Sequence, residues 1–151
     1  MFSLFKKKDF FSKEENDRIV AAIRDAERST SGEVRVFVEG RCKFIDPMDR
    51  ALEIFSELKM EDTQDRNAVL LYVAIKDRQL AIYGDRGIHE KTGSDYWHQE
   101  VDKMVSEFSN KHYSEGIAHC VEDIGQALYS YFPYNGETDK NELPDDIIFG
   151  R

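Results

Sequence analysis

The fold is decided by residues 62–85, DTQDRNAVLLYVAIKDRQLAIYGD. An acidic loop leads into the apolar run 68–75, which is typical of a central strand covered on both faces. A short turn at Asp77 and Arg78 leads into a second predicted strand, residues 79–84. In such a hairpin the end of the second strand lies beside the start of the first, so we expect residues 65–67 to meet Asp85 at one end of the sheet.

The segments around this hairpin predict four helices and one further strand. Ser12 and Glu15 have the spacing of a capping box, and apolar residues at helical spacing follow as far as Gly32. Residues 33–39 alternate valine with other residues, which indicates a strand. The second helix is predicted to begin at Pro47, because proline fits the first turn of a helix. Two more helices are predicted over 97–108 and 114–131.

The predicted order of elements is therefore α-β-α-β-β-α-α. It favours an α/β fold: a three-layer α/β/α sandwich in which helices flank a small mixed sheet of three or four strands. A β-α-β crossover makes the first two strands parallel, and the hairpin adds an antiparallel strand. We expect one domain with three parts: a basic N-terminal segment (1–11), the α/β domain (12–133) and an acidic C-terminal tail (134–151) whose apolar end docks.

Charge and hydropathy argue against several classes of protein. The formal net charge of −9 disfavours binding to nucleic acid, which requires a basic surface. No apolar run approaches the roughly 20 residues of a transmembrane helix, and the N-terminus lacks the apolar stretch of a secretory signal. Cys42 and Cys120 stand alone, as is usual for reduced cysteines. A cytoplasmic location is the resulting prediction.

The first 11 residues leave two interpretations open. Lys6, Lys7 and Lys8 lie among phenylalanines and a leucine, a pattern that permits weak contact with an anionic membrane surface. Alternatively, the basic segment only solubilises the chain and packs a few phenylalanines onto the domain. Three clustered lysines bind anionic lipid weakly, which favours the second interpretation.

The end of the sheet is the candidate functional site. A parallel crossover also brings the start of the first strand there, so Glu33 joins the cluster. The predicted metal ligands are Asp65, Asp85, Asn67, Asp62 and Glu33. Oxygen ligands of this kind suit Ca²⁺, which takes 6–8 of them, with Mg²⁺ or Zn²⁺ as alternatives. Arg66 and Arg86 are the predicted anion-binding residues, because a guanidinium matches phosphate and carboxylate.

A purely structural interpretation competes with this site. Asp65 can cap a turn, Arg66 can pair with Asp85 as a salt bridge at the sheet edge, and Gly87 can serve a positive φ. The spacing matches neither an EF-hand nor a glycine-rich phosphate loop. His112 and His119 each precede a glutamate by three residues, but a solvated helix face explains that spacing better than a zinc site.

Five segments resemble the TPM domain family over about residues 10–149. They are FSKEE (11–15), AERSTSGE (26–33), TQDRNAVLL (63–71), YGDRGI (83–88) and NELPD (141–145). The resemblance implies an α/β sandwich. The best-described members of that family lie in the thylakoid lumen and aid photosystem II repair, and acid phosphatase activity belongs to some of them. Soluble bacterial members bind divalent cations.

The resemblance carries the polar cluster of the family onto Asp65, Arg66, Asn67 and Asp85. A divalent-cation-binding TPM domain protein of unassigned physiological role is therefore the expected function. The alternatives are a metal-assisted hydrolase similar to acid phosphatases and a non-catalytic, chaperone-like interaction module. Because neither a signal peptide nor a membrane anchor is expected, the photosynthetic role is not expected to transfer.

Overall fold

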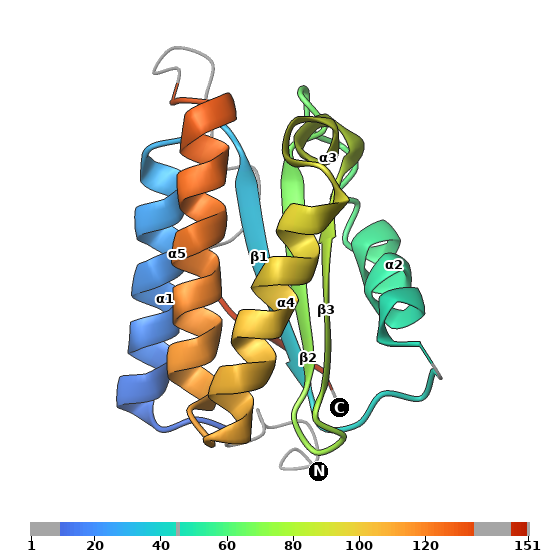
Figure 1. Ribbon diagram of the computed structural model, residues 1–151, viewed down its shortest axis with the longest axis vertical. Helices are drawn as coiled ribbons and strands as arrows, with labels where there is room; N and C mark the ends of the chain where they lie inside the picture. Colours follow the sequence, from blue (N-terminus) through green and yellow to red (C-terminus); the bar gives the residue numbers. More distant parts are fainter. Residues whose placement is uncertain (1–9, 45, 135–145, 151) are drawn as a thin grey trace, which may run out of the picture.

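The computed structural model describes residues 10–44, 46–134 and 146–150. Its elements alternate as predicted, with two additions (Figure 1). In chain order they are α1 (Lys13–Arg28), β1 (Glu33–Glu39), α2 (Pro47–Glu57), β2 (Ala68–Ala74), β3 (Gln79–Gly84), α3 (Arg86–Thr92), α4 (Ser94–Ser109), α5 (Tyr113–Tyr131) and β4 (Ile148–Phe149).

The four strands form one mixed sheet in the order β3-β2-β1-β4. β1 runs parallel to β2 with Glu33 opposite Ala68, and β2 runs antiparallel to β3 with Val69 opposite Gly84. Both the crossover and the hairpin are thus confirmed. The register brings the start of β1, the start of β2 and the end of β3 to one end of the sheet.

Helices cover both faces of the sheet, which confirms the three-layer sandwich. In Figure 1, α1 and α5 lie side by side on one face with α4 beside them, and α2 lies on the other. Val34, Val36 and Val38 of β1 join the core under α1, α4 and α5, whereas Phe37 joins the smaller core under α2. This division follows from the alternation of side chains along a strand.

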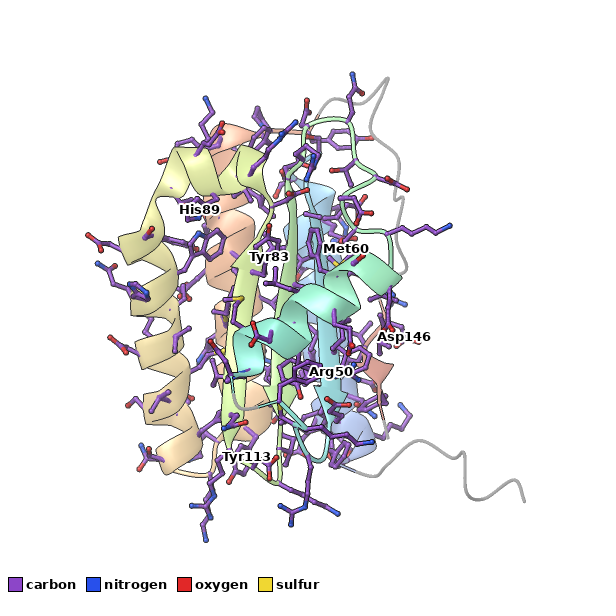
Figure 2. The ribbon with its side chains drawn as sticks, turned by 90° about the vertical axis from the view of Figure 1, so that its right-hand side faces the viewer. Arg50, Met60, Tyr83, His89, Tyr113 and Asp146 are labelled. Atoms are coloured by element: carbon purple, nitrogen blue, oxygen red, sulfur yellow. The ribbon has the colours of Figure 1, made fainter. Side chains whose placement is uncertain are left out.

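A buried polar cluster holds α2 against the sheet. Glu39 of β1 accepts two hydrogen bonds from Arg50 of α2, with N···O distances of 2.9 and 3.0 Å, and a third from the Tyr72 hydroxyl at 2.5 Å. Figure 2 looks onto α2 and shows Arg50 in front of the sheet. Burial, and next the bond to Glu39, raise the pKa of Tyr72, so the phenol remains a donor.

Two elements were not predicted. The short helix α3 begins directly after β3, where the Asp85 side chain caps it by accepting from the Arg86 amide. The short strand β4 pairs in parallel with β1, and the Gly150 amide extends the pairing by donating to Val38 O. The C-terminal apolar end, which the sequence analysis expects to dock, pairs as a short strand at the sheet edge. Residues 135–145 lie outside the described ranges.

The N-terminal phenylalanines that the structure describes pack onto the domain. Phe11 is buried in the main core, and the Phe10 ring stacks on Phe149 with centroids 6.3 Å apart. Residues 1–9, on which the predicted membrane contact depends, lie outside the described ranges. Within those ranges, no helix has the length and apolar content that crossing a bilayer requires.

Candidate functional site

A bidentate ion pair stands at the centre of the predicted site. Arg66 donates to Asp85 through Nε (2.6 Å to Oδ2) and Nη2 (2.9 Å to Oδ1). The Asp85 side chain is 1% exposed and its Oδ1 also accepts from the Arg86 amide. The bond to Asp85 raises the pKa of Arg66. Three donors thus converge on one carboxylate. The salt bridge between Arg66 and Asp85, which the purely structural interpretation requires, is present.

Close backbone packing fixes the acidic loop against the start of α3. The Gly87 amide donates to Arg66 O at 2.8 Å. A Cβ on Gly87 would lie 2.0 Å from Asp65 O, closer than real contacts allow. Gly87 is therefore needed for space; the positive φ belongs to Arg66, at 51°. The loop and the first turn of α3 form a single tight joint.

Glu33 and Asn67 reach this end of the sheet but lie on opposite faces. Both are 2% exposed. Glu33 shares the α2 face with Phe37, because the two are four residues apart on one strand. The Asn67 side chain donates to Ser31 Oγ at 3.3 Å, on the face that α1 and α5 cover. The topology therefore brings the predicted ligands to one end of the sheet but not into one cluster.

The remaining predicted carboxylates, Asp62 and Asp65, lie in the loop before β2, which also contains Glu61. Asp62 and Asp65 are exposed, and Glu61 is half-buried. None of these three carboxylates makes a side-chain hydrogen bond or ion pair to another described residue, whereas Asp85 makes three bonds. Thr63 in the same loop has a buried hydroxyl oxygen without a hydrogen-bond partner in the described ranges. The loop consequently carries three carboxylates without direct partners among the described residues, of which Glu61 lies within the electrostatic influence of Arg66.

The described residues contain no preformed metal centre. No group of three or more His, Cys, Asp and Glu side chains among them is arranged to hold an ion. The oxygen donors of the loop match the preferences of Ca²⁺ and Mg²⁺. Zn²⁺ prefers sulfur and imidazole, and the loop offers neither. The loop therefore matches Ca²⁺ and Mg²⁺ in the type of its donor atoms. The Asp85 carboxylate is already paired with Arg66.

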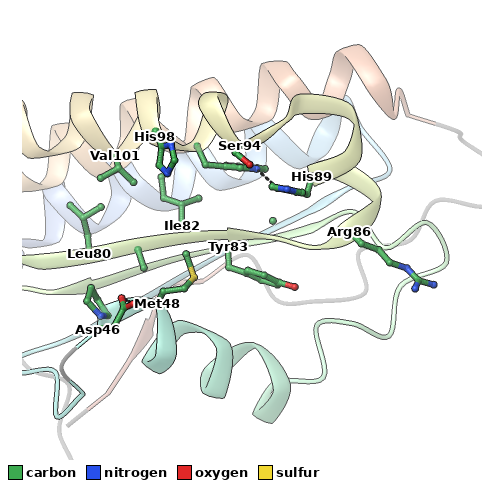
Figure 3. A pocket seen from close by; sticks show the side chains of 14 residues that line it. Asp46, Met48, Leu80, Ile82, Tyr83, Arg86, His89, Ser94, His98 and Val101 are labelled. Carbon is green, nitrogen blue, oxygen red and sulfur yellow. Dashed lines mark hydrogen bonds between the residues drawn. The ribbon is translucent and has the colours of Figure 1, made fainter.

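Arg86 has a different environment from Arg66. It is exposed and forms no ion pair with another described residue. It lies at one end of a groove of about 470 Å³ that follows β3 between α2 and α4 (Figure 3). In this groove Trp97 Nε1 donates to His89 Nδ1 at 3.0 Å, so the proton of a neutral His89 ring belongs on Nε2. Of the two predicted anion-binding residues, Arg86 is the one with its guanidinium available.

A second polar cluster, between α4 and α5, was missed by the sequence analysis. Glu100 is 3% exposed, and Lys103 Nζ lies 3.3 Å from it and 3.2 Å from Asp123. Burial, and next the hydrogen bond with Asp123, raise the pKa of Glu100 to about 7. The signal in the sequence was the position of this glutamate, three residues after Trp97 and four before Met104 on the buried stripe of the helix.

Comparison with known proteins identifies the family. A sequence model described as the TPM domain matches residues 4–127. The chain belongs to the TPM domain family. Among curated proteins, none matches this TPM domain.

Solved structures with the same fold include domains from bacteria. This TPM domain is 41% identical to BA42 from the psychrophilic bacterium Bizionia argentinensis, with a TM-score of 0.85 over 96% of this chain and 99% of that one. An N-terminal domain of a protein from P. gingivalis shares the fold at 17% identity and a TM-score of 0.70, over 84% of this chain and 83% of that one. The N-terminal domain of cg2496 from Corynebacterium glutamicum shares it at 16% identity and a TM-score of 0.63, over 79% of this chain and 74% of that one.

Replacing Asp85 with alanine is expected to destabilise the joint between the loop and α3. The substitution removes two hydrogen bonds to a guanidinium and the cap of α3, so the free energy of unfolding should fall by about 1.5–3 kcal/mol. Urea denaturation measures the change. Asp62→Ala, an exposed acid in the same loop, is the control and should shift stability by less than about 0.5 kcal/mol. Equal effects of the two substitutions would contradict the assignment.

The buried Glu100 predicts a specific pH dependence of stability. Its pKa is about 7 in the folded chain, above the ordinary value of 4.5, so between these values the folded state binds more protons than the unfolded one. Stability should therefore fall as pH rises from about 4.5 to 7, and Glu100→Gln should remove that part of the fall. Thermal unfolding between pH 4.5 and 8 tests this, with the exposed Glu90→Gln as control. An unchanged slope in Glu100→Gln would refute it.

Proposed function

We propose that this TPM domain binds a divalent cation at the acidic loop, residues 61–65, with Ca²⁺ favoured over Mg²⁺. One observation supports the proposal: three carboxylates within five residues have no hydrogen-bond or ion-pair partner among the described residues, although a guanidinium lies close by. The hydrogen bonds of Arg66 are made to Asp85, and Arg66 acts on the loop through a weaker coulombic attraction to Glu61. A cation would relieve the repulsion among these carboxylates.

The residues proposed to hold the ion differ from the predicted ligands, because Glu61 joins them and Asp85, Asn67 and Glu33 do not contribute. Asp62, Asp65 and Glu61 supply carboxylates, while Thr63 and the backbone carbonyls of the loop supply neutral oxygens. Asp85 and Asn67 act behind the loop and hold its end in place. A bound ion would supply a concentrated positive charge at the surface; the residues of the chain position it and set its affinity. Few charged ligands and an exposed loop favour weak binding, with Kd on the order of 0.1–1 mM.

The proposal predicts where a cation perturbs the molecule. Titration of the ¹⁵N-labelled full chain with CaCl₂, at ionic strength matched by NaCl, should shift the amide resonances of residues 61–66. Asp62→Asn/Asp65→Asn should abolish these shifts. Asp95→Asn/Asp102→Asn, which removes two exposed acids from α4, is matched in charge and should retain them. The melting temperature should rise with Ca²⁺ in the wild type and in the matched control only.

Two results would refute this function. One is the absence of any amide shift in residues 61–66 up to about 10 mM Ca²⁺ or Mg²⁺, which is well above the range of weak protein sites. The other is an equal loss of shifts in both double variants, which would indicate a general effect of net charge. If Zn²⁺ shifted the resonances of residues 61–66 at lower concentrations than Ca²⁺ does, the cation assigned to the loop would be Zn²⁺ instead.

A metal-assisted phosphatase is the second candidate, and the exposed Arg86 is the observation that favours it. A guanidinium without an ion-pair partner can stabilise the charge of a phosphoryl group. The groove also contains His89, Ser94 and His98. None of these side chains forms a nucleophile–base pair with another described residue, so cation binding remains the better-supported function.

Hydrolysis of p-nitrophenyl phosphate tests this candidate. If Arg86 stabilises the transition state, Arg86→Gln should reduce kcat by about 100-fold. Arg78→Gln removes an exposed arginine from the β2–β3 turn and should leave kcat unchanged. Hydrolysis that survives Arg86→Gln would point to another site or a contaminant. A cytoplasmic location stays a prediction, as does a non-catalytic role in which the chain assists other proteins.

A further inference from the structure

The outer edge of β3 carries unused backbone hydrogen-bonding groups. β3 is the first strand of the sheet order, so β2 covers only one of its sides. The Asp85 amide donates to Ala68 O at 2.9 Å, and hydrogen-bonded pairs alternate along an antiparallel ladder. Leu80, Ile82 and Gly84 therefore direct their N–H and C=O groups away from β2. In the described part of the chain, no backbone group pairs with this outer side.

This edge forms the floor of the groove described above. One wall comes from α4 and contains Trp97 and Val101; the other comes from the start of α2 and contains Met48 (Figure 3). Side chains of β3 alternate between the walls: Leu80 and Ile82 lie on the α4 side, with Ala81 and Tyr83 on the α2 side. Anything that lies along the edge thus meets apolar surface on both sides.

The sequence of β3 does not protect its edge. Natural edge strands usually carry charged residues, prolines or bulges that prevent pairing with another strand. β3 reads QLAIYG, without a charge or a proline, and its register with β2 is continuous over six pairs. The edge has the regular geometry that an additional strand requires, and because Ile82 is 3% exposed and Gly84 is buried, a strand can enter only if the walls of the groove move apart.

The walls determine what kind of strand can enter. In a dimer formed edge to edge, each copy would bring its own α2 and α4, which project beside its own β3. These helices would meet those of the partner before the two edges came within the 4.7–4.9 Å that paired strands require. A single extended peptide segment has no such flanks and fits between the walls.

Charges at the two ends of the groove complement an extended segment with ionic ends. Arg86 lies at the Gly84 end, exposed and without an ion pair in the described ranges. Asp46 lies at the Leu80 end, where one of its carboxylate oxygens caps α2 by accepting from the Met48 amide. Opposite charges on a ligand, acidic near Arg86 and basic near Asp46, would match this pattern.

We propose that β3 binds an extended, apolar peptide segment of about five residues by strand addition. Its backbone pairs with Leu80, Ile82 and Gly84, its side chains contact both apolar walls, and an acidic residue lies near Arg86. The partner is therefore an exposed apolar stretch of another polypeptide. This inference is independent of the proposed cation site, which lies in the loop before β2.

Two pentapeptides test the proposal with the full-length chain. Acetyl-Lys-Val-Ile-Val-Asp-amide places its acid near Arg86 if it binds parallel to β3, and acetyl-Asp-Val-Ile-Val-Lys-amide does so if it binds antiparallel. One of them, at up to about 1 mM, should shift the amide resonances of Leu80, Ile82 and Gly84 with a Kd on the order of 100 μM. The same peptide N-methylated at all five residues should bind at least tenfold more weakly, because none of its residues can then donate a backbone hydrogen bond.

Two valines on α4 provide a matched pair of variants. Val101 lines the groove, and Val105, one turn further along, is 50% exposed outside it. Val101→Glu should weaken peptide binding at least tenfold and Val105→Glu should not. Urea denaturation confirms that both variants fold.

Four results of the peptide titrations would overturn the proposal. They are no shift with either peptide, equal binding of the N-methylated peptide, equal affinity in the two valine variants, and shifts confined to other strands. Shifts of the β3 amides that depend on protein concentration without peptide would identify a second copy as the occupant, and would overturn it as well. Cation binding at residues 61–66 would be unaffected by any of these results.

Discussion

This end of the molecule depends on the hydrogen bonds that the Asp85 carboxylate accepts. It lies at the junction of β3 and α3, where it accepts from Arg66 across the hairpin and from the Arg86 amide at the start of the helix. The same few atoms therefore fix the acidic loop, end the strand and begin the helix. Gly87 completes the joint, because only a residue without a side chain lets the loop carbonyls approach so closely.

Much of the fold could be predicted because local sequence patterns identify both strands of its central hairpin and the turn between them. The apolar run of β2 and the alternation of β1 specify the strands, and the chain order then requires the parallel register. The same register contains a detail that the prediction overlooked. Glu33 pairs with Ala68, so Asn67, one residue earlier, has to face the opposite side of the sheet. Strand alternation alone would have separated these two candidate ligands.

Other features could not be predicted, for physical reasons. α3 has seven residues and β4 has two, too few for a hydrophobic period to appear. Arg66 had two plausible roles, ligand for an anion or partner of Asp85, and only the three-dimensional distance decides between them. Glu100 was overlooked because a glutamate reads as a surface residue unless its place on the buried stripe is considered. The acidic loop itself was visible in the sequence, because its carboxylates are close along the chain.

The parallel pairing of β1 with β4 has a consequence for the order in which the chain can assemble. β1 is synthesised early, but the strand that covers its outer side is contributed by residues 148 and 149. Until those residues leave the ribosome, the nascent chain exposes a bare flank of β1 beside valines destined for the core. Such a flank favours association between neighbouring nascent chains until a segment translated long after β1 covers it.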